Sequence, residues 1–216
     1  MTNMDTTIRR PGLAETLAGR LFRPGPHVTY IIFLVIIAFF VIFAPNFASL
    51  NTAGAIGRIT AVVGIMAVGM TFVIVCGEID LSVGSHVSFA AMVVAMLLYN
   101  GVPGWIAAPA VLLLGACVGS VNGLIVTKLR IPSFLVTLGM LSVLRGLALS
   151  FTGSMPVPIV NKPYVEVMAG GTLLGVPAPI WWTLATVIVG FYLLHLSVFG
   201  RRALATGGNT IAARFS

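Results

Sequence analysis

The sequence is short of charge. Only 8% of its 216 residues are charged, and five residues in all carry a carboxylate. A soluble domain has about a quarter of its residues charged, so an ordinary water-soluble fold is excluded. There are only two cysteines, which exclude a disulfide framework, and they show no metal-ligand spacing.

Most of the residues are apolar. Hydrophobic residues make up 58% of the sequence, and the mean hydropathy is +1.08. This composition indicates an integral membrane protein. The formal charge of +7 does not indicate nucleic-acid binding, because the basic residues are scattered between apolar runs and form no patch. They are better interpreted as markers of membrane topology.

Six apolar runs approach the ~20 residues that a helix needs to cross a hydrocarbon core of ~30 Å. We expect spans at 28–44, 56–75, 83–99, 105–127, 132–150 and 180–198. The first run follows a polar leader without a clear cleavage site, so we expect it to be retained as a span. The predicted fold class is all-α, a polytopic transmembrane helix bundle. Residues 151–179, between the last two spans, are predicted to form an ordered or partly re-entrant loop.

The basic residues predict the orientation of these spans. Loops that stay in the cytoplasm carry an excess of Lys and Arg. A cytoplasmic N-terminus also places on the inside Lys128, Arg130, Arg201, Arg202 and Arg214. Only Arg58 and Lys162 then fall toward the outside. We therefore expect a multi-pass protein whose N-terminus is cytoplasmic.

One cytoplasmic loop breaks this positive pattern. Residues 76–84 contain two of the five carboxylates, Glu78 and Asp80, between the second and third spans. An ionised carboxylate in so apolar a chain needs a partner or polar surroundings. Asp80 is followed closely by a small hydroxyl residue, and we expect it to accept free N–H groups at the start of the third span, as a helix cap.

The fourth span contains a glycine at every fourth position. Gly115, Gly119 and Gly123 should lie on one helix face. In lipid, where packing drives helix association, such a face lets a neighbouring helix approach closely. We therefore expect the fourth span to lie inside the bundle.

Several motifs, in this order along the chain, resemble a known family. They are Gly77-Glu78-Ile79-Asp80-Leu81-Ser82-Val83-Gly84, then Asn122-Gly123 with Thr127-Lys128-Leu129-Arg130-Ile131-Pro132-Ser133-Phe134, then Thr137-Leu138-Gly139-Met140, then Arg145-Gly146 with Thr152-Gly153, and Gly200-Arg201 with Gly207-Gly208-Asn209 and Ala212-Ala213-Arg214. The set resembles the permease subunits of bacterial ABC importers for monosaccharides, the ribose/xylose/galactose-type group. Glu78 stands where many relatives have glycine, and we infer no change of substrate from it.

The resemblance implies a division of labour. A periplasmic sugar-binding protein delivers the sugar, two permeases form the path as a homo- or heterodimer, and cytoplasmic ABC ATPases drive the cycle. ATP is bound by the separate ATPase subunit, so we expect no cofactor, no metal and no catalytic residue in this chain. It is expected to be a carrier of solute and not an enzyme, surrounded by lipid in the bacterial inner membrane.

The resemblance also divides the chain. We expect a cytoplasmic tail at 1–27, an incomplete permease domain at 28–200 with six of the family's about ten spans, and the start of an ATPase-coupling segment at 201–216. The residues expected to couple are Gly207, Gly208, Asn209, Ala212, Ala213 and Arg214. Residues 151–179 are the corresponding candidate for contact with the binding protein.

Asn122, Thr137 and Arg145 are candidates for lining the sugar path. For Asn122 an interhelical hydrogen bond is the stronger interpretation. For Arg145 we slightly favour a side chain that snorkels to the outer interface. Contact of Asp80 with sugar hydroxyls is a weaker alternative to capping, because its predicted position is near the cytoplasmic surface.

The alternative function is a secondary transporter or channel for a small polar solute. Such proteins usually place ionisable groups or broken helices near the middle of the membrane. The central parts of the predicted spans are nearly free of charge, which favours an external source of energy. An intramembrane aspartyl protease is disfavoured, because Glu78 and Asp80 are two positions apart and would not face each other on a helix.

Overall fold

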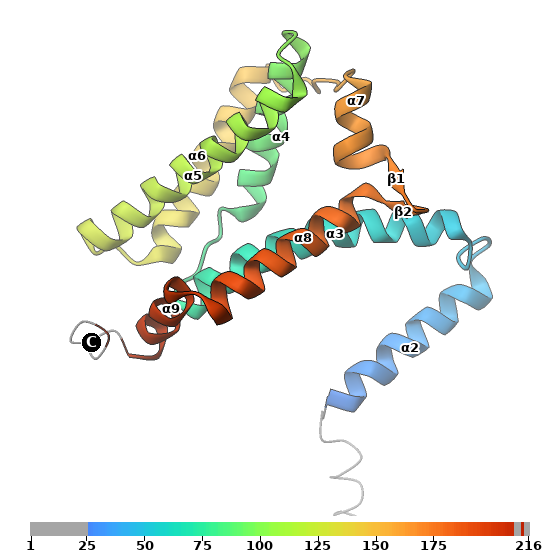
Figure 1. Ribbon diagram of the computed structural model, residues 1–216, viewed down its shortest axis with the longest axis horizontal. Coiled ribbons are helices and arrows are strands. Elements are labelled where there is room, and N and C mark those ends of the chain that lie inside the picture. Colours follow the sequence, from blue (N-terminus) through green and yellow to red (C-terminus); the bar gives the residue numbers. More distant parts are fainter. Residues whose placement is uncertain (1–25, 210–212, 214–216) are drawn as a thin grey trace, which may run out of the picture. The chain divides into compact units, whose positions relative to one another are not determined.

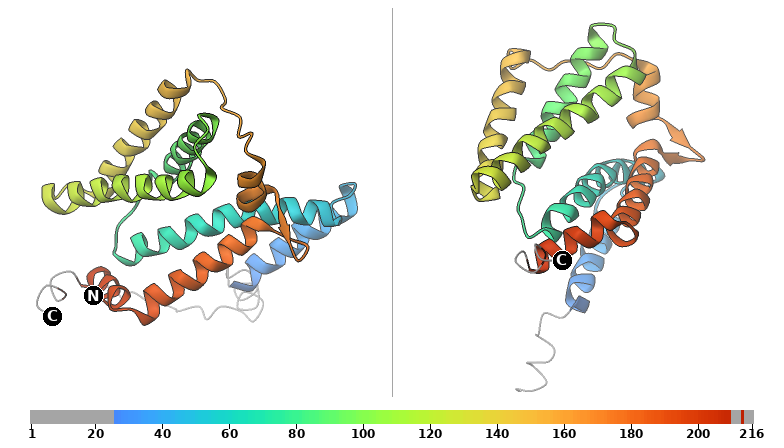
Figure 2. Two further views of the ribbon diagram at one scale, coloured as in Figure 1. Left: turned by 45° about the horizontal axis from the view of Figure 1, so that its top comes forward. Right: turned by 60° about the vertical axis from the view of Figure 1, so that its left-hand side comes forward.

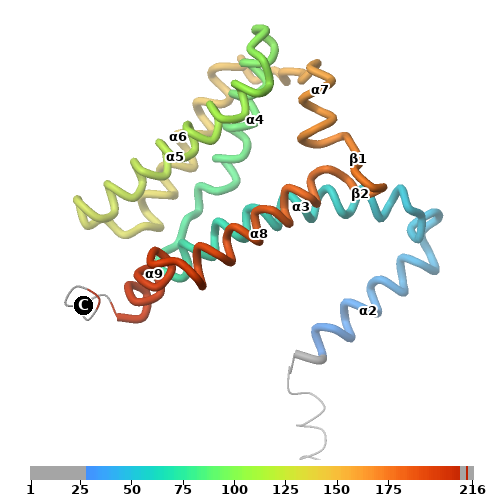
Figure 3. The backbone as a smooth tube through the Cα atoms, viewed as in Figure 1, coloured from blue at the N-terminus to red at the C-terminus, as the bar shows by residue number. Residues whose placement is uncertain are grey.

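The computed structural model of the chain describes residues 26–209 and 213, which are mostly helical (Figure 1). The longer helices are α2 (Pro26–Phe43), α3 (Leu50–Val75), α4 (Val83–Tyr99), α5 (Gly104–Leu129), α6 (Ser133–Thr152), α8 (Ala178–Phe191) and α9 (Val198–Gly208). The shorter elements are α7 (Lys162–Val165), the π-helical turns η1 (Glu166–Gly170) and η2 (Tyr192–Leu196), and a hairpin of β1 (Thr172–Leu173) and β2 (Val176–Pro177). Figure 3 traces the same path as a tube. Residues 1–25 of the predicted tail lie outside the described residues.

Each predicted span is a helix in the structure. Four are long and apolar enough to cross a membrane, Leu50–Val75, Gly104–Leu129, Ser133–Thr152 and Ala178–Leu196, and two shorter apolar helices are Val28–Phe43 and Val83–Tyr99. Many of their large apolar side chains are exposed on the described chain, which suits lipid and not water. The all-α, polytopic membrane fold is thus confirmed. The second span is longer than predicted, because α3 begins at Leu50 and not at residue 56.

The chain divides into two compact units, Met1–Ala53 and Gly54–Ser216. The described part of the first unit contains α2 and the first turn of α3. Ser49 caps that turn, because its hydroxyl accepts a hydrogen bond from the backbone N–H of Thr52 at 3.2 Å. The rest of α3 and every later element belong to the second unit.

Within the second unit, α4 packs against both α5 and α6. One apolar core joins Phe89 and Met92 of α4 to Leu144 of α6, and a second joins α4 to Ala107 of α5. The α5 residues that contribute to these cores or are buried are Ala107, Val111, Leu114, Val118 and Asn122. Their spacing of three and four places them on one helix face.

That packing face is not the glycine face. A Cβ built on Gly115, Gly119 or Gly123 would meet no heavy atom within 4 Å. No helix of the described residues approaches at these glycines, so the expected close approach there stays a prediction. Each of these glycines comes directly after a packing residue, so it lies about 100° around the helix from the side that faces α4 and α6.

The close helix approach occurs instead between α3 and α8, which lie side by side (Figures 1 and 2). A Cβ on Gly57 would lie 2.9 Å from Ile180 Cδ1, and one on Gly190 would lie 2.6 Å from Val68 Cγ1. Thr183 Oγ1 adds a hydrogen bond to the Ala61 carbonyl at 2.9 Å. Glycines on each helix thus leave room for side chains of the facing helix, as is usual for helices packed in lipid.

The order of these contacts gives the helix directions. Residue numbers rise together along α3 and α8, from Gly57 beside Ile180 to Val68 beside Gly190. The two helices are therefore parallel. This agrees with the predicted alternation, in which the second and sixth spans cross the membrane in the same direction.

We predict that Gly190→Ala destabilises the protein by about 1–3 kcal/mol, because the added methyl group overlaps Val68 in a packed interface. Gly146→Ala in α6 is the matched control, because its Cβ would meet nothing within 4 Å. Thermal unfolding of both variants in detergent tests this. Equal midpoints for the two variants would contradict the close packing of α3 on α8.

Candidate functional site

The candidate site is the non-helical link between α3 and α4, residues 76–82, which we call the α3–α4 reversal. Gly77 ends α3 with a positive φ of 81°, which favours glycine. The N–H of Gly77 donates to the Ile74 carbonyl at 2.9 Å, and that of Glu78 donates to the Val73 carbonyl at 3.1 Å. This pair of bonds is a Schellman motif, which satisfies carbonyls that α3 would otherwise leave free.

Asp80 organises the other end of the reversal. Its Oδ1 accepts the Ser82 N–H at 2.7 Å and the Ser82 hydroxyl at 2.6 Å. Ser82 is fully buried and is the N-cap residue of α4, whose own first turn receives no side-chain cap. The predicted cap therefore needs correction: the carboxylate fixes the residue before the helix and does not bind N–H groups within it. The reason is that Ser82 intervenes between Asp80 and Val83, the first helical residue.

Side chains of α6 hold the middle of the reversal. Thr137 Oγ1 accepts the Leu81 N–H at 3.1 Å, and it also lies 3.3 Å from the Ile79 carbonyl, to which it can donate. Ser133 Oγ accepts the Ile79 N–H at 3.2 Å. Thr137 is only 4% exposed. It is therefore placed as a backbone anchor, and no described hollow is lined by it.

α5 contributes Asn122, which is 6% exposed. Its Nδ2 donates to Ser82 Oγ at 3.5 Å, so the predicted hydrogen bond from this helix to a neighbouring segment is present. Its Oδ1 and the Nε2 of His86, one turn into α4, are buried without a protein partner among the described residues. The sequence analysis names Ser82 as part of the motif, but it does not predict that Asp80 and Asn122 both bond to this residue.

The last helix closes the site from the C-terminal side. A break at Ser197, whose hydroxyl accepts the Gly200 N–H at 3.1 Å, starts α9 as a separate helix. At its end, a Cβ on Gly207 would overlap the Val75 carbonyl oxygen, so α9 touches the end of α3. Gly208 faces open space, and Ala213 N donates to the Asn209 carbonyl at 2.9 Å. Ala212 and Arg214 lie outside the described residues.

The structure thus gathers four separated motifs at one place. The reversal at 76–82 contacts the beginning of α6, a buried amide of α5 and the end of α9. These segments are the ones that the charge pattern predicts to lie on one side of the membrane. No group of three or more His, Cys, Asp or Glu side chains with metal-site geometry occurs among the residues that the structure describes.

Comparison with known proteins identifies the family. Residues 52–216 match the family model described as the permease component of the branched-chain amino acid transport system. The chain belongs to this permease family. It is 39% identical over 209 residues to the ribose import permease protein of Escherichia coli strain K12, covering 94% of this chain and 65% of that protein. It is also 36% identical over 186 residues to the L-arabinose transport system permease protein of that strain, covering 86% of this chain and 56% of that protein.

The chain therefore spans less than two thirds of the length of these curated relatives. A further relative, the ribose import permease protein of Haemophilus influenzae, is 34% identical over 191 residues, covering 87% of this chain and 59% of that protein. No solved structure matches the chain significantly. All three relatives carry the names of transport permeases and not of enzymes.

The segment between α6 and α8, which was predicted to be an ordered or partly re-entrant loop, contains the ordered elements α7, η1, β1 and β2. Asn161 Oδ1 accepts the Tyr164 N–H at 3.0 Å and so starts α7. Tyr164 packs beside Gly104 at the start of α5, and burial raises the pKa of its phenol above the ordinary value. The indole N–H of Trp182 donates to the Val167 carbonyl at 2.9 Å, which ties α8 to η1.

Arg145, the third candidate for the path, lies apart from the reversal. It is exposed on α6 and faces a hollow between α4 and α6. No ion pair joins it to a carboxylate in the described part of the chain, because the acidic residues there lie outside the long spans.

We predict that Thr137→Val destabilises the permease by about 1 kcal/mol, because it removes the acceptor of the partly buried hydrogen bond from the Leu81 N–H while keeping the side-chain volume. Ser142→Ala is the control on the same helix, because that hydroxyl is exposed and bonds only to its own helix. Thermal unfolding in detergent measures both. A Thr137→Val protein as stable as the control would show that the reversal does not depend on α6.

Proposed function

We propose that this chain forms part of the membrane path of an ATP-driven importer for a small sugar. The single observation that carries the proposal is its family membership together with relatives named for ribose and L-arabinose transport. The helical membrane fold is compatible with it. The chain itself would break no covalent bond and need no cofactor or metal, with ATP bound by a separate subunit.

The proposal includes three protein partners. A cytoplasmic ABC ATPase would dock near α9, a periplasmic sugar-binding protein would contact the outer loop, and a second permease would complete the path. The location would be the bacterial inner membrane, with the N-terminus in the cytoplasm. Support for the orientation comes from the basic residues Lys128 and Arg130 at the C-terminal end of α5 and Arg201 and Arg202 in the first half of α9.

A passive channel or secondary transporter is less well supported. Proton- or ion-coupled transporters carry carboxylates within their spans. The described spans contain none, since Glu78 and Asp80 lie in the reversal and Glu166 lies in the outer loop. An importer driven by an attached ATPase needs no such group.

We predict that the permease, reconstituted with its ATPase in proteoliposomes, hydrolyses ATP faster when sugar-loaded binding protein is present. In an importer, contact of the binding protein with one side of the membrane must change the activity of the ATPase on the other side. Stimulated ATP hydrolysis is therefore expected of an importer. Phosphate release with loaded, empty and no binding protein is the measurement. Hydrolysis that ignores the binding protein, or sugar uptake without ATP, would contradict the proposal.

We also predict that Gly207→Ala weakens this stimulation, whereas Gly208→Ala does not. The methyl group at position 207 has no room beside the Val75 carbonyl and would push α9 away from the reversal, while the neighbouring position is open. Both substitutions add the same group to adjacent residues, so helix propensity is matched. Equal stimulation by the two proteins would show that this contact plays no part in coupling.

A further inference from the structure

Arg145 is a cation far from both ends of α6. It follows Ser133, the first residue of that helix, by twelve positions, which is about 18 Å of rise. It precedes Thr152, the last residue, by seven, which is about 10 Å. A charged side chain at such depth is costly in lipid and normally faces a polar cavity or a partner. No carboxylate of the described residues forms an ion pair with Arg145, so the role of this side chain is inferred from the hollow that it lines.

The hollow beside Arg145 has at least one polar side chain on each wall. It has a volume of about 380 Å³ and is lined by Gly84, Ser85 and Ser88 of α4 and by Leu141, Arg145, Ala148 and Leu149 of α6. Ser85 donates its hydroxyl hydrogen to the Ser82 carbonyl at 2.9 Å, and Ser88 donates to the Gly84 carbonyl at 3.1 Å. Both hydroxyl oxygens keep lone pairs that can accept. The hollow therefore combines guanidinium donors with hydroxyl acceptors.

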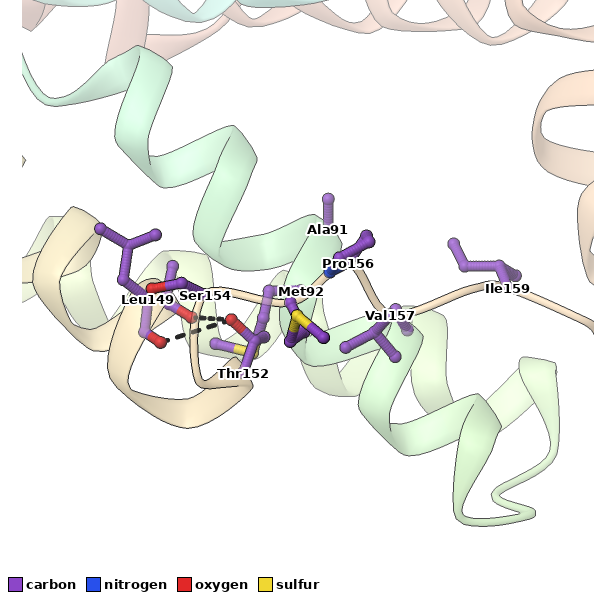
Figure 4. Close-up of a pocket in the computed structure, with 11 residues that line it drawn as sticks. Ala91, Met92, Leu149, Thr152, Ser154, Pro156, Val157 and Ile159 are labelled. Atoms are coloured by element: carbon purple, nitrogen blue, oxygen red, sulfur yellow. Dashed lines mark hydrogen bonds between the residues drawn. The ribbon is translucent and has the colours of Figure 1, made fainter.

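A second hollow lies next to this one. The second, of about 480 Å³, shares Ala148 and Leu149 with the first and extends past Ala91, Met92 and Ala95 to Thr152 and residues 154–159 (Figure 4). Together they form what we call the α4–α6 groove. Its α4 side is made largely of small residues three or four positions apart, and from Gly84 to Ala95 it extends about 16 Å.

We propose that the α4–α6 groove is a stretch of the solute path and that Arg145, with Ser88 opposite, hydrogen-bonds the hydroxyl groups of the passing sugar. The inference rests on the proposed function, and it names two residues of the path that the sugar would take through the importer. Sugar hydroxyls both donate and accept hydrogen bonds. They can therefore accept from Arg145 on the α6 wall and donate to the serine oxygens on the α4 wall. Arg145 contributes a planar fork of donors, which a lysine cannot reproduce. A snorkelling arginine, by contrast, would use its charge alone, which lysine also carries.

The first test asks whether water reaches the groove, and it needs no transport. In a protein with Cys76 and Cys117 replaced by serine, Ser88→Cys is compared with Val143→Cys, an exposed α6 position that lines neither hollow. A charged, water-soluble methanethiosulfonate should modify position 88 at least about tenfold faster, because thiolates form in water and not in lipid. Equally slow modification at both positions would overturn the proposal.

The second test separates hydroxyl binding from snorkelling. Uptake of D-ribose is measured for Arg145→Lys and Arg145→Gln, with Ser142→Ala as the control and folded yield recorded for each. Both Arg145 variants should lose about tenfold in uptake, the size of one lost hydrogen bond to a charged group. Arg145→Lys with unchanged uptake would overturn the proposal in favour of snorkelling. Absence of ribose uptake by the unsubstituted protein would count against the proposed function, and the labelling test would still decide whether the groove is a water-accessible path.

Discussion

The hydrogen bonding of the reversal at 76–82 is the constraint on which the second unit depends. A chain that turns between two membrane helices exposes backbone N–H and C=O groups, and in or near lipid these groups need partners from the protein. Here α3 supplies its own partners through the Schellman motif at Gly77, and Asp80 and Thr137 supply those of the next residues. The turn is therefore fixed by side chains from other parts of the sequence. Its position in turn fixes where α4 begins relative to α6.

This arrangement puts two functional surfaces next to each other. On one side of the reversal, α9 contacts the end of α3 through Gly207. On the other side, the first turn of α4 carries Gly84 and Ser85, where the α4–α6 groove begins. A displacement of α9 would reach the groove through one short segment that is held by hydrogen bonds. Packed elements with fixed partners move as units, so such a segment transmits a shift better than a loose loop.

The spans could be predicted from the sequence because a helix that crosses lipid needs a minimum length and an apolar composition, and hydropathy shows both. It predicted helix ends less well. The start of α3 was missed because Asn51, Thr52 and Arg58 are polar, although a helix can extend beyond the hydrocarbon region where Ser49 caps it. The separate helix α9 was missed because its apolar beginning continues the last span. The available signal was Ser197, a good N-cap residue three positions before Gly200.

Contacts within the site were predictable only in part. Residue type indicated that Asp80 and Asn122 would need polar partners, but not that both partners would be Ser82, because that depends on how three helices meet. The glycines show the same limit. A four-residue spacing defines a face, and nothing in the sequence of α5 says whether a neighbour occupies it.

Some small residues make tight contacts between helices and others line the groove, and the difference depends on which side chains lie beside them. Gly57 and Gly190 each contact a branched side chain on the facing helix, so the space left by the missing side chain is filled by that neighbour. Gly84, Ala91 and Ala95 face the groove instead, where small size leaves volume unfilled. In a soluble protein such volume would collapse or fill with apolar groups. Here the volume lies beside Arg145, which forms no ion pair among the described residues, and a polar solute that passes through the groove would supply the hydrogen bonds that this side chain lacks.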